Sequence, residues 1–405
     1  MREARRLERV PPYFFAEMDR TKARLLRNGV DLIDLGVGDP DTPTPEPIVR
    51  ELCRQAPQPA NHRYPAYEGS VEFRQAICQY YASRFGVSLD PEREAIGLIG
   101  SKEGLSHLVW AFVDPGDCVL VPDPAYPVYA VQTLLSGGSP YHMPLLSEND
   151  FLPDFDAIPP DVLSRARLMF LNYPNNPTSA VCSLDFFRKA VEFAREHGML
   201  ICHDAAYIEM SYDGFAAPSI LQVDGAREVA VETYSWSKPF NMTGWRIAAM
   251  LGSGRAISAL RVIKTNTDSG QFTAVQMAAA LALRDEPGAF IMAMNSMYSK
   301  RRDALIKGLE RAGLDPVMPH GTFYVWCPVP VGEDSSSFSA LLLKEAHVIV
   351  APGSAYGARG EGYVRFALTV DEARLEEAAS RIGGVLASGM RERARGETRE
   401  RPRPY

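Results

Sequence analysis

The 405-residue sequence lacks a long apolar segment, an excess of positive charge and an apolar stretch behind its first basic residues. The longest nearly apolar run, "AVQMAAALAL" at 274–283, is much shorter than the about 20 residues that a membrane-spanning helix needs. The formal net charge of −7 gives no electrostatic reason to expect nucleic acid or an anionic membrane as a partner. We therefore expect a cytoplasmic protein that acts on small molecules.

Cysteine and histidine are sparse and dispersed. The six cysteines form no CxxC pair, and several lie in apolar segments, which is typical of reduced, buried thiols. The seven histidines form no HExxH motif and no cluster with cysteine at metal-ligand spacing. These patterns predict neither a disulfide framework nor a metal site.

The middle of the chain alternates apolar runs of strand length with amphipathic segments of helix length. The expected strands are "AIGLIGS" (95–101), "CVLVP" (118–122), "RLMFLNYP" (167–174), "MLICHDAAY" (199–207) and "VAVETY" (229–234). Apolar residues at 105, 108, 109 and 112 have the spacing of one helix face, and 183–197 is a second helix-like stretch. The alternation predicts an α/β domain whose mostly parallel sheet is covered by helices on both faces. Ligands in such sheets bind at the carboxyl ends of the strands.

The pattern changes after about residue 286. A long helix-like segment (289–313) leads to a strand-like one (322–329), and further helix and strand patterns complete an α+β unit. We expect an N-terminal arm (1–45) that packs with this smaller domain, a large domain (46–285), a small C-terminal domain (286–389) and a disordered tail (390–405).

Three strand ends carry polar residues suited to holding a ligand. "GSKEG" (100–104) joins a strand to a helix, where backbone N–H groups can bind an anion. "NYPNNPTS" (172–179) presents Asn176 in a rigid turn, and "HDAAY" (203–207) places Asp204 at the end of an apolar strand, with Tyr207 close by. Each motif alone also fits an ordinary turn or helix cap.

Lys238, in "SWSKPFNMTGWR" (235–246), has three interpretations. It can be a solvated surface lysine. It can belong to the SxxK motif of serine acyl-transfer enzymes, but Pro239 disfavours the helix that this motif begins, and the companion motifs are absent. It can be a desolvated lysine whose amine forms a Schiff base with a carbonyl.

The third interpretation unites the strand-end motifs. Pyridoxal phosphate needs an anion cradle, a lysine, an acid at its pyridine nitrogen, donors to its 3-oxygen and an aromatic ring to stack on. The chain offers "GSKEG", Lys238, Asp204, the pair Asn176 and Tyr207, and Tyr126 of "DPAYPVY". Their joint presence after successive strands indicates a pyridoxal phosphate enzyme.

These motifs resemble those of the fold-type I, class I/II aminotransferases that use pyridoxal phosphate, over about residues 10 to 388. Other matching stretches are "LGVGDPDTPTP" (35–45), "YPAYEG" (64–69) and "YVRFAL" (363–368). The resemblance implies a large domain with a mostly parallel seven-stranded sheet between helices, plus a smaller α+β domain. It also implies amino acid and 2-oxo acid substrates and a homodimer with shared active sites.

The resemblance further implies roles for individual residues. Lys238 would carry the cofactor and move the substrate proton, Asp204 would keep the pyridine nitrogen protonated, and Tyr126 would stack on the ring. Asn176 and Tyr207 would donate to the 3-oxygen. The phosphate would be held by Ser101, Lys102, Ser235, Ser237 and Arg246, together with Tyr64 of the neighbouring subunit. The substrate α-carboxylate would bind to Arg365, Gly38 and Asn176.

Within the family, the motifs are most similar to those of LL-diaminopimelate aminotransferases, including "KTNTDSGQF" (264–272) and the aromatic "PPYFF" (11–15). Tyr13 and the 264–272 segment are the candidates for recognising the distal end of diaminopimelate. Trp236 departs from the leucine that these enzymes more often carry. Alanine and aspartate aminotransferases share most of the motifs. A β-lyase or decarboxylase would also keep Lys238 and Asp204, whereas aminotransferase-like transcription regulators carry an additional DNA-binding domain.

Overall fold

The computed structural model describes residues 1–11, 14–284 and 287–399, without the side chains of 14–19 and 389–399. The chain forms two compact units. The large unit comprises Met1–Pro12, Pro40–Ser296 and His320–Thr322, and the small unit comprises Tyr13–Asp39, Met297–Pro319 and Phe323–Tyr405. Within the described ranges, no helix combines the length and the apolar character needed to cross a bilayer.

A seven-stranded sheet organises the large unit, with strand order β2-β8-β7-β6-β5-β3-β4. Its strands are β2 (Ala95–Leu98), β3 (Cys118–Asp123), β4 (Ser139–Pro144), β5 (Ala166–Leu171), β6 (Leu200–Asp204), β7 (Ala230–Ser235) and β8 (Ala248–Gly252). Strands β4, β3, β5, β6 and β7 are parallel neighbours, whereas β8 runs antiparallel between β7 and β2. The expected mostly parallel, seven-stranded sheet is therefore confirmed.

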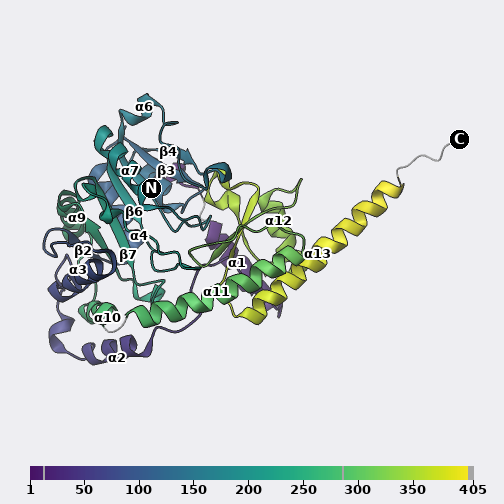
Figure 1. Cartoon of the computed structure of the whole chain (residues 1–405), viewed down its shortest axis with the longest axis horizontal. Coiled ribbons are helices and arrows are strands. Elements are labelled where there is room, and N and C mark those ends of the chain that lie inside the picture. The colour runs from purple at the N-terminus through teal and green to yellow at the C-terminus, as the bar shows by residue number, and fades with distance from the viewer. Residues whose placement is uncertain (12–13, 285–286, 400–405) are drawn as a thin grey trace. The chain divides into compact units, whose positions relative to one another are not determined.

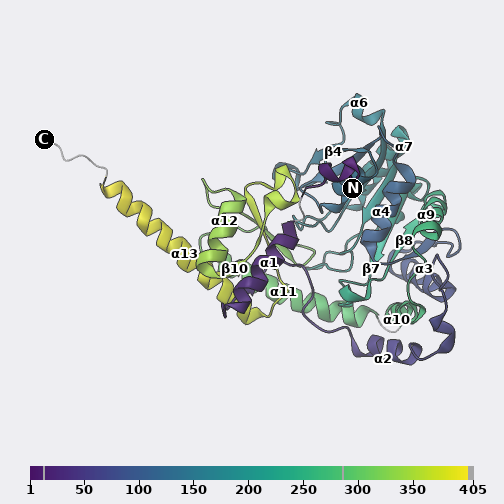
Figure 2. The same cartoon turned by 180° about the vertical axis from the view of Figure 1, so that it is seen from behind.

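Helices lie on both faces of this sheet, as the opposite views in Figure 1 and Figure 2 show. The helices of the large unit are α2 (Glu46–Gln55), α3 (Val71–Phe85), α4 (Ser101–Phe112), α5 (Val128–Leu135), α6 (Pro160–Leu163), α7 (Leu184–His197), α8 (Ala226–Val229), α9 (Gly254–Thr267) and α10 (Thr273–Arg284). Several have the expected terminal signals: Ser70 caps α3, Ser183 caps α7, and Gly86 and Gly198 end these helices in left-handed conformation.

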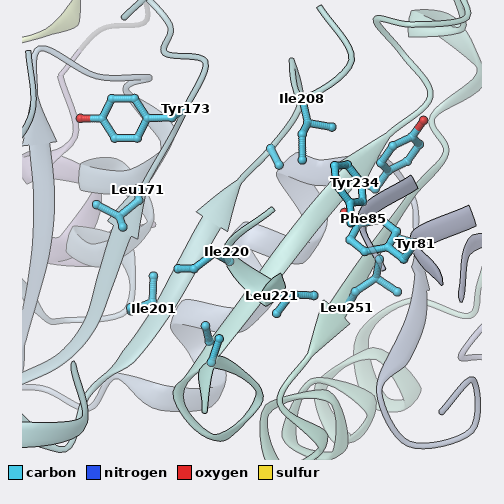
Figure 3. Packing of buried hydrophobic residues seen from close by; sticks show 14 of the residues in the cluster. Tyr81, Phe85, Leu171, Tyr173, Ile201, Ile208, Ile220, Leu221, Tyr234 and Leu251 are labelled. Atoms are coloured by element: carbon cyan, nitrogen blue, oxygen red, sulfur yellow. The ribbon is translucent and has the colours of Figure 1, made fainter. Parts of the chain in front are cut away.

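The parallel strands are buried on both faces, so alternate residues enter two separate apolar clusters. On β6, Ile201 joins the cluster with α3, α7 and α10, whereas Cys202 joins the cluster with α4 and α9. Figure 3 shows the first cluster, where Leu171 and Ile201 from neighbouring strands lie near Ile220 and Leu221. This period-2 alternation decides which strand-end side chains share a face.

The small unit contains two small sheets and the α-helices that pack with them. Its strands are β1 (Ile33–Asp34), which pairs with β10 (Val348–Ile349), and β9 (Tyr324–Pro328), β11 (Ala351–Pro352) and β12 (Tyr363–Ala367), which pair in the order β11-β12-β9. Its helices are α1 (Phe14–Arg27), α12 (Ser335–Leu341) and α13 (Glu372–Arg399), and α11 (Pro287–Arg311) begins in the large unit and continues in the small one.

Three parts of the predicted domain division differ from the structure. The small domain was expected to begin at residue 286, but residues 287–296 and His320–Thr322 belong to the large unit. The predicted N-terminal arm is divided between the two units: residues 14–39 belong to the small unit, whereas residues 1–11 and 40–45 belong to the large one. There Arg6 Nη1 donates to the carbonyl of Leu135 at the end of α5, at 3.0 Å. The tail also differs, because α13 continues to Arg399 through residues of high helix propensity. The end of the predicted tail, 400–405, lies outside the described residues.

Candidate active site

Asp204 ends β6 in a fully buried position, as expected for a carboxylate at a strand end. Its Oδ2 accepts a hydrogen bond from the Tyr129 hydroxyl at 2.8 Å, and its Oδ1 accepts one from the Thr233 hydroxyl at 2.9 Å. Thr233 is the β7 residue paired with Asp204 in the ladder, and Tyr129 lies on α5. The pairing of β6 with β7 thus positions the Thr233 donor, and helix α5, which covers the sheet, positions the Tyr129 donor.

Burial raises the pKa of Asp204, and the hydroxyls of Tyr129 and Thr233 partly oppose this by stabilising the carboxylate. The two carboxylate oxygens can accept about four hydrogen bonds together, and they receive one from each of these hydroxyls and one from the backbone N–H of Ala206. The carboxylate therefore retains the capacity to accept a bond from a cationic N–H group. A protonated pyridine nitrogen fits this requirement.

The N-terminus of α4, predicted as an anion cradle, has features suited to that role. Gly100, the residue before the helix, has φ of 76° and provides no side-chain cap. A Cβ atom at this position would overlap the guanidinium of Arg246, so only glycine allows the arginine to lie against the backbone. Among the described residues, the buried Ser101 hydroxyl oxygen has no hydrogen-bond partner. These features fit a bound phosphate.

Lys102 strengthens the positive character of this cradle. Partial burial and the nearby charge of Arg246 lower the pKa of Lys102, which shows that two cations are held close together. The Lys102 ammonium also lies 5.8 Å from the centre of the Tyr126 ring, and this ring meets Tyr129 edge-on at 5.8 Å. Tyr126 therefore lies between the cradle and the aromatic side chain that contacts Asp204.

A second support for the cradle comes from residues 264–276. The Gln271 side chain donates to the carbonyls of Trp245 and Arg246 at 2.6 and 2.7 Å, and thereby fixes Arg246, whose φ is 55°. Lys264 Nζ pairs with Glu103 at 3.2 Å and Asp268 at 3.0 Å. With His107, these two acids have metal-ligand spacing, but the buried ammonium already balances their charge.

Lys238 lies in the turn directly after β7, and its side chain is half-buried. Ser235 and Ser237 are buried beside it, and the Ser237 amide donates to Ser235 Oγ at 3.2 Å. Trp236 points away into the core, where its Nε1 donates to the carbonyl of Ala279 on α10 at 2.9 Å. Because successive side chains point in opposite directions here, Trp236 lies in the core, whereas Ser235 and Ser237 lie together near Lys238.

Asn176 and Tyr207 follow the neighbouring strands β5 and β6, and both are buried. The Asn176 amide N–H donates to Asn172 Oδ1 at 2.8 Å, and Asn172 Nδ2 donates to the carbonyl of Asp204 at 2.6 Å. The structure thus joins Asn176 to Asp204 through one side chain.

Two predicted substrate ligands, Arg365 and Gly38, lie in the small unit. The Arg365 guanidinium carbon lies 3.9 Å from the centre of the Tyr324 ring and 4.9 Å from that of Tyr356, and its Nη2 donates to the carbonyl of Gly36 at 2.7 Å. A Cβ at Gly38 would overlap the Tyr324 hydroxyl. The planar guanidinium of Arg365 thus packs against two aromatic rings, which restricts its orientation.

Two predicted site residues remain, Tyr64 and Tyr13. Tyr64 lies in a loop of the large unit with 89% of its surface exposed, which is unusual for a tyrosine within a folded domain. Tyr13 lies outside the described residues.

Sequence reasoning missed Tyr129, Thr233 and Asn172. Tyr129 belongs to the motif "DPAYPVY", in which only Tyr126 was given a role. Thr233 could have been found from the β6–β7 register, because it pairs with Asp204. Asn172 begins the Asn/Pro motif, but the bonds made by its amide depend on where β6 ends in space.

Comparisons with known proteins agree with this site. Residues 30–382 match the family model described as aminotransferase class I and II. The LL-diaminopimelate aminotransferase of Syntrophobacter fumaroxidans is 52% identical over 380 residues, which cover 94% of this chain and 98% of the relative. The LL-diaminopimelate aminotransferase of Moorella thermoacetica is 51% identical over 386 residues, with 95% and 99% covered.

Solved structures show the same architecture. Substrate-bound BacF from Bacillus subtilis has a TM-score of 0.92 and 37% identity, covering 95% of this chain and 98% of its own. An aspartate aminotransferase mutant from Thermus thermophilus has a TM-score of 0.88 and 32% identity, covering 95% and 100%. The family match implies dependence on pyridoxal phosphate. The family match and the relatives of about 50% identity show that the chain belongs to the class I and II aminotransferases and is a transaminase.

Proposed function

We propose that this enzyme transfers an amino group from LL-diaminopimelate to 2-oxoglutarate, with pyridoxal phosphate bound in the large unit, as a step of lysine biosynthesis. The observation that carries the cofactor assignment is the buried Asp204, which two hydroxyls stabilise while leaving acceptor capacity for a cationic N–H group. The donor assignment is supported by the relatives of about 50% identity, which are LL-diaminopimelate aminotransferases.

The bound cofactor supplies an electron sink for the bond between the substrate Cα and its hydrogen. In our proposal Ser101, Lys102, Ser235, Ser237 and Arg246 hold its phosphate. Tyr126 stacks on the ring, and Asn176 and Tyr207 donate to the 3-oxygen. Asp204 keeps a proton on the ring nitrogen, since loss of that proton would leave a buried carboxylate without its cationic partner.

Lys238 has two roles in this proposal. Its amine would hold the cofactor covalently in the resting enzyme, and once the substrate has freed it, Nζ would act as the base that takes and returns the proton of the substrate Cα. The turn after β7 suits both roles, because backbone bonds from Phe240 N to Trp236 O and from Met242 N to Ser237 O, each of 3.2 Å, hold the segment around the lysine.

Substrate recognition uses the small unit in this proposal. Arg365 binds the α-carboxylate through its planar fork, and the backbone at Gly38 and the amide of Asn176 contribute to the same carboxylate. The rings of Tyr324 and Tyr356 fix the arginine before substrate arrives, which lowers the entropy cost of binding. Because all amino acids share this carboxylate, selection of diaminopimelate falls to Tyr13 and the 264–272 segment.

The proposal includes a cytoplasmic homodimer in which Tyr64 contacts the phosphate bound by the partner. The 89% exposure of this ring supports the idea, because a partner subunit would cover it. Mixing the Tyr64→Ala and Lys238→Ala variants tests it, since one hybrid site regains both residues. Recovery of activity after verified subunit exchange is expected, and its absence would count against shared sites.

Two experiments test the chemistry and the donor. Borohydride reduction of the yellow holoenzyme should fix the cofactor on Lys238, and an adduct on another lysine would refute the assignment. A donor panel with 2-oxoglutarate should give the highest kcat/KM with LL-diaminopimelate among meso-diaminopimelate, alanine, aspartate, glutamate and aromatic amino acids. A tenfold advantage for alanine or aspartate would overturn the donor assignment but not the transaminase assignment.

A further inference from the structure

Asn172 is a buried amide placed where β5 and β6 stop pairing. The last pair in their ladder is Leu171 with His203, so residues 172 and 204 are the first beyond this ladder, although Asp204 still pairs with Thr233 of β7. Only 2% of Asn172 is exposed. Its side chain continues the cross-strand bonding beyond the ladder, since Nδ2 donates to the carbonyl of Asp204 at 2.6 Å.

The other end of the same amide holds the following loop. Asn172 Oδ1 accepts from the backbone N–H of Asn176 at 2.8 Å. A single planar group thus bonds, through opposite atoms, to the backbones of the two residues assigned to the ring nitrogen and the 3-oxygen of the cofactor. We propose that Asn172 is a positioning residue that sets the spacing between Asp204 and Asn176, an inference that rests on the proposed function.

The backbone of Asn172 is itself fixed by other groups. Asn175 Nδ2 donates to the Asn172 carbonyl at 3.1 Å. On the neighbouring residue, the Tyr173 carbonyl lies 3.0 Å from His203 Nε2, and the Tyr173 N–H donates to this nitrogen at 3.3 Å. The Asn172 side chain is therefore not needed to keep its own backbone in place. Its two bonds act on Asp204 and Asn176.

An amide is suited to this task because it offers a donor and an acceptor in one rigid plane. The substitution Asn172→Asp keeps the shape and the acceptor for Asn176, but while ionised it presents an oxygen to the carbonyl of Asp204. When protonated, the new carboxyl group can donate to that carbonyl and restore the bond. Because the site is buried, this protonation occurs at a higher pH than for an exposed aspartate.

The test compares cofactor binding and spectra of wild type, N172D and N172S at several pH values between 5 and 9. For N172D we expect pyridoxal phosphate to dissociate roughly 3- to 10-fold more readily at high pH, with recovery towards wild type as the pH falls. N172S removes both bonds without adding a charge, so its loss of affinity should persist at every pH. The pH midpoint of the visible absorption band should also shift in both variants, because the groups around the ring have moved.

N295D is the matched control. Asn295 Nδ2 also donates to a backbone carbonyl, that of Glu209, at 2.8 Å, but among the described residues it bonds to none of those assigned to the cofactor. The same amide-to-acid change there should leave the affinity for pyridoxal phosphate and the absorption midpoint at wild-type values. Thermal melting of all variants without cofactor separates loss of folding from loss of positioning.

Three outcomes would overturn the inference. These are wild-type cofactor affinity in N172S, a loss in N172D that does not change with pH, and an equal loss in N295D. Failure of the proposed function is distinguished by Asp204→Ala: wild-type cofactor affinity, absorption midpoint and turnover in that variant would show that Asp204 does not serve the ring nitrogen. A defect in Asp204→Ala together with wild-type behaviour of N172S would reject the role of Asn172 alone.

Discussion

Two buried acids lie on neighbouring strands of the large sheet, and their surroundings differ. Glu232 on β7 is fully buried and accepts four bonds: from His203 Nδ1 at 2.7 Å, the Tyr81 hydroxyl at 2.7 Å, the Ser219 hydroxyl at 2.7 Å and the Ile220 amide at 3.0 Å. Within the described residues, Asp204 on β6 accepts three: from the hydroxyls of Tyr129 and Thr233 and from the backbone N–H of Ala206.

The two acids also face opposite sides of the sheet. Glu232 and its ladder partner His203 lie on the face of α3 and α7, and Asp204 and its ladder partner Thr233 lie on the face of α4 and α5. Since buried carboxylates need hydrogen bonds, the complete set of donors around Glu232 indicates a structural role. The smaller set around Asp204 indicates that a ligand supplies the remaining partner.

The strongest test of this contrast is Asp204→Ala. We expect kcat/KM to fall by roughly 10²- to 10³-fold, because the cationic ring nitrogen would lose its buried partner. The free energy of unfolding of the cofactor-free protein should change little. Steady-state kinetics and urea unfolding measure both quantities, with Asp185→Ala as the control that removes an exposed carboxylate. Near-normal turnover would show that the two acids do not differ in role.

The converse test is Glu232→Gln, which should lower the free energy of unfolding while it leaves most of kcat. The new amide group places N–H donors against a site that contains the donors of His203 and Ile220. The free energy of unfolding should fall by about 3 kcal/mol. Variants that remain folded should keep most of their kcat. An unchanged urea midpoint would mean that the four bonds to Glu232 contribute no net stability.

A pH series sharpens the comparison. The pKa of Asp204 is raised above its ordinary value of 3.8, chiefly by burial. The stability that this group contributes is present below about pH 3.8 and is lost as the pH rises through its higher folded-state pKa. Cofactor-free Asp204→Asn should therefore melt a few degrees above wild type at neutral pH, and the difference should vanish towards pH 4. A constant difference across this range would contradict the raised pKa.

The smallest effect is expected for an exposed acid of the small unit. Hydrogen bonds from Arg374 and Arg381 lower the pKa of Asp31 to about 2, so its contribution to stability is present above pH 3.8 and lost towards pH 2. Water and salt screen this pair of contacts. Asp31→Asn should lower the thermal midpoint less than Glu232→Gln does, and added salt should reduce its effect further. A larger loss than that of Glu232→Gln would reverse the comparison between buried and exposed acids.

Much of the fold could be predicted because apolar periodicity is a local property. The run "CVLVP" became β3, and the helix pattern at 183–197 became α7 with its serine cap and glycine end. The division into units was harder, because residues 1–45 separate according to what each part packs against. The helix through 390–399 was also missed, since a charged composition is compatible with both a tail and an exposed helix.

The sequence by itself determined which chemical groups stand at the strand ends: Lys238, Asp204, Asn176 and the cradle at Gly100. It did so because strands and turns are specified by neighbouring residues. Only the tertiary structure decided which groups meet. Thr233 reaches Asp204 because two strands pair in a particular register, Tyr129 reaches it because α5 covers that face, and Asn172 spans two loops. The contacts with Asp204 join residues between 29 and 75 positions apart, and such contacts follow from packing rather than from any local pattern.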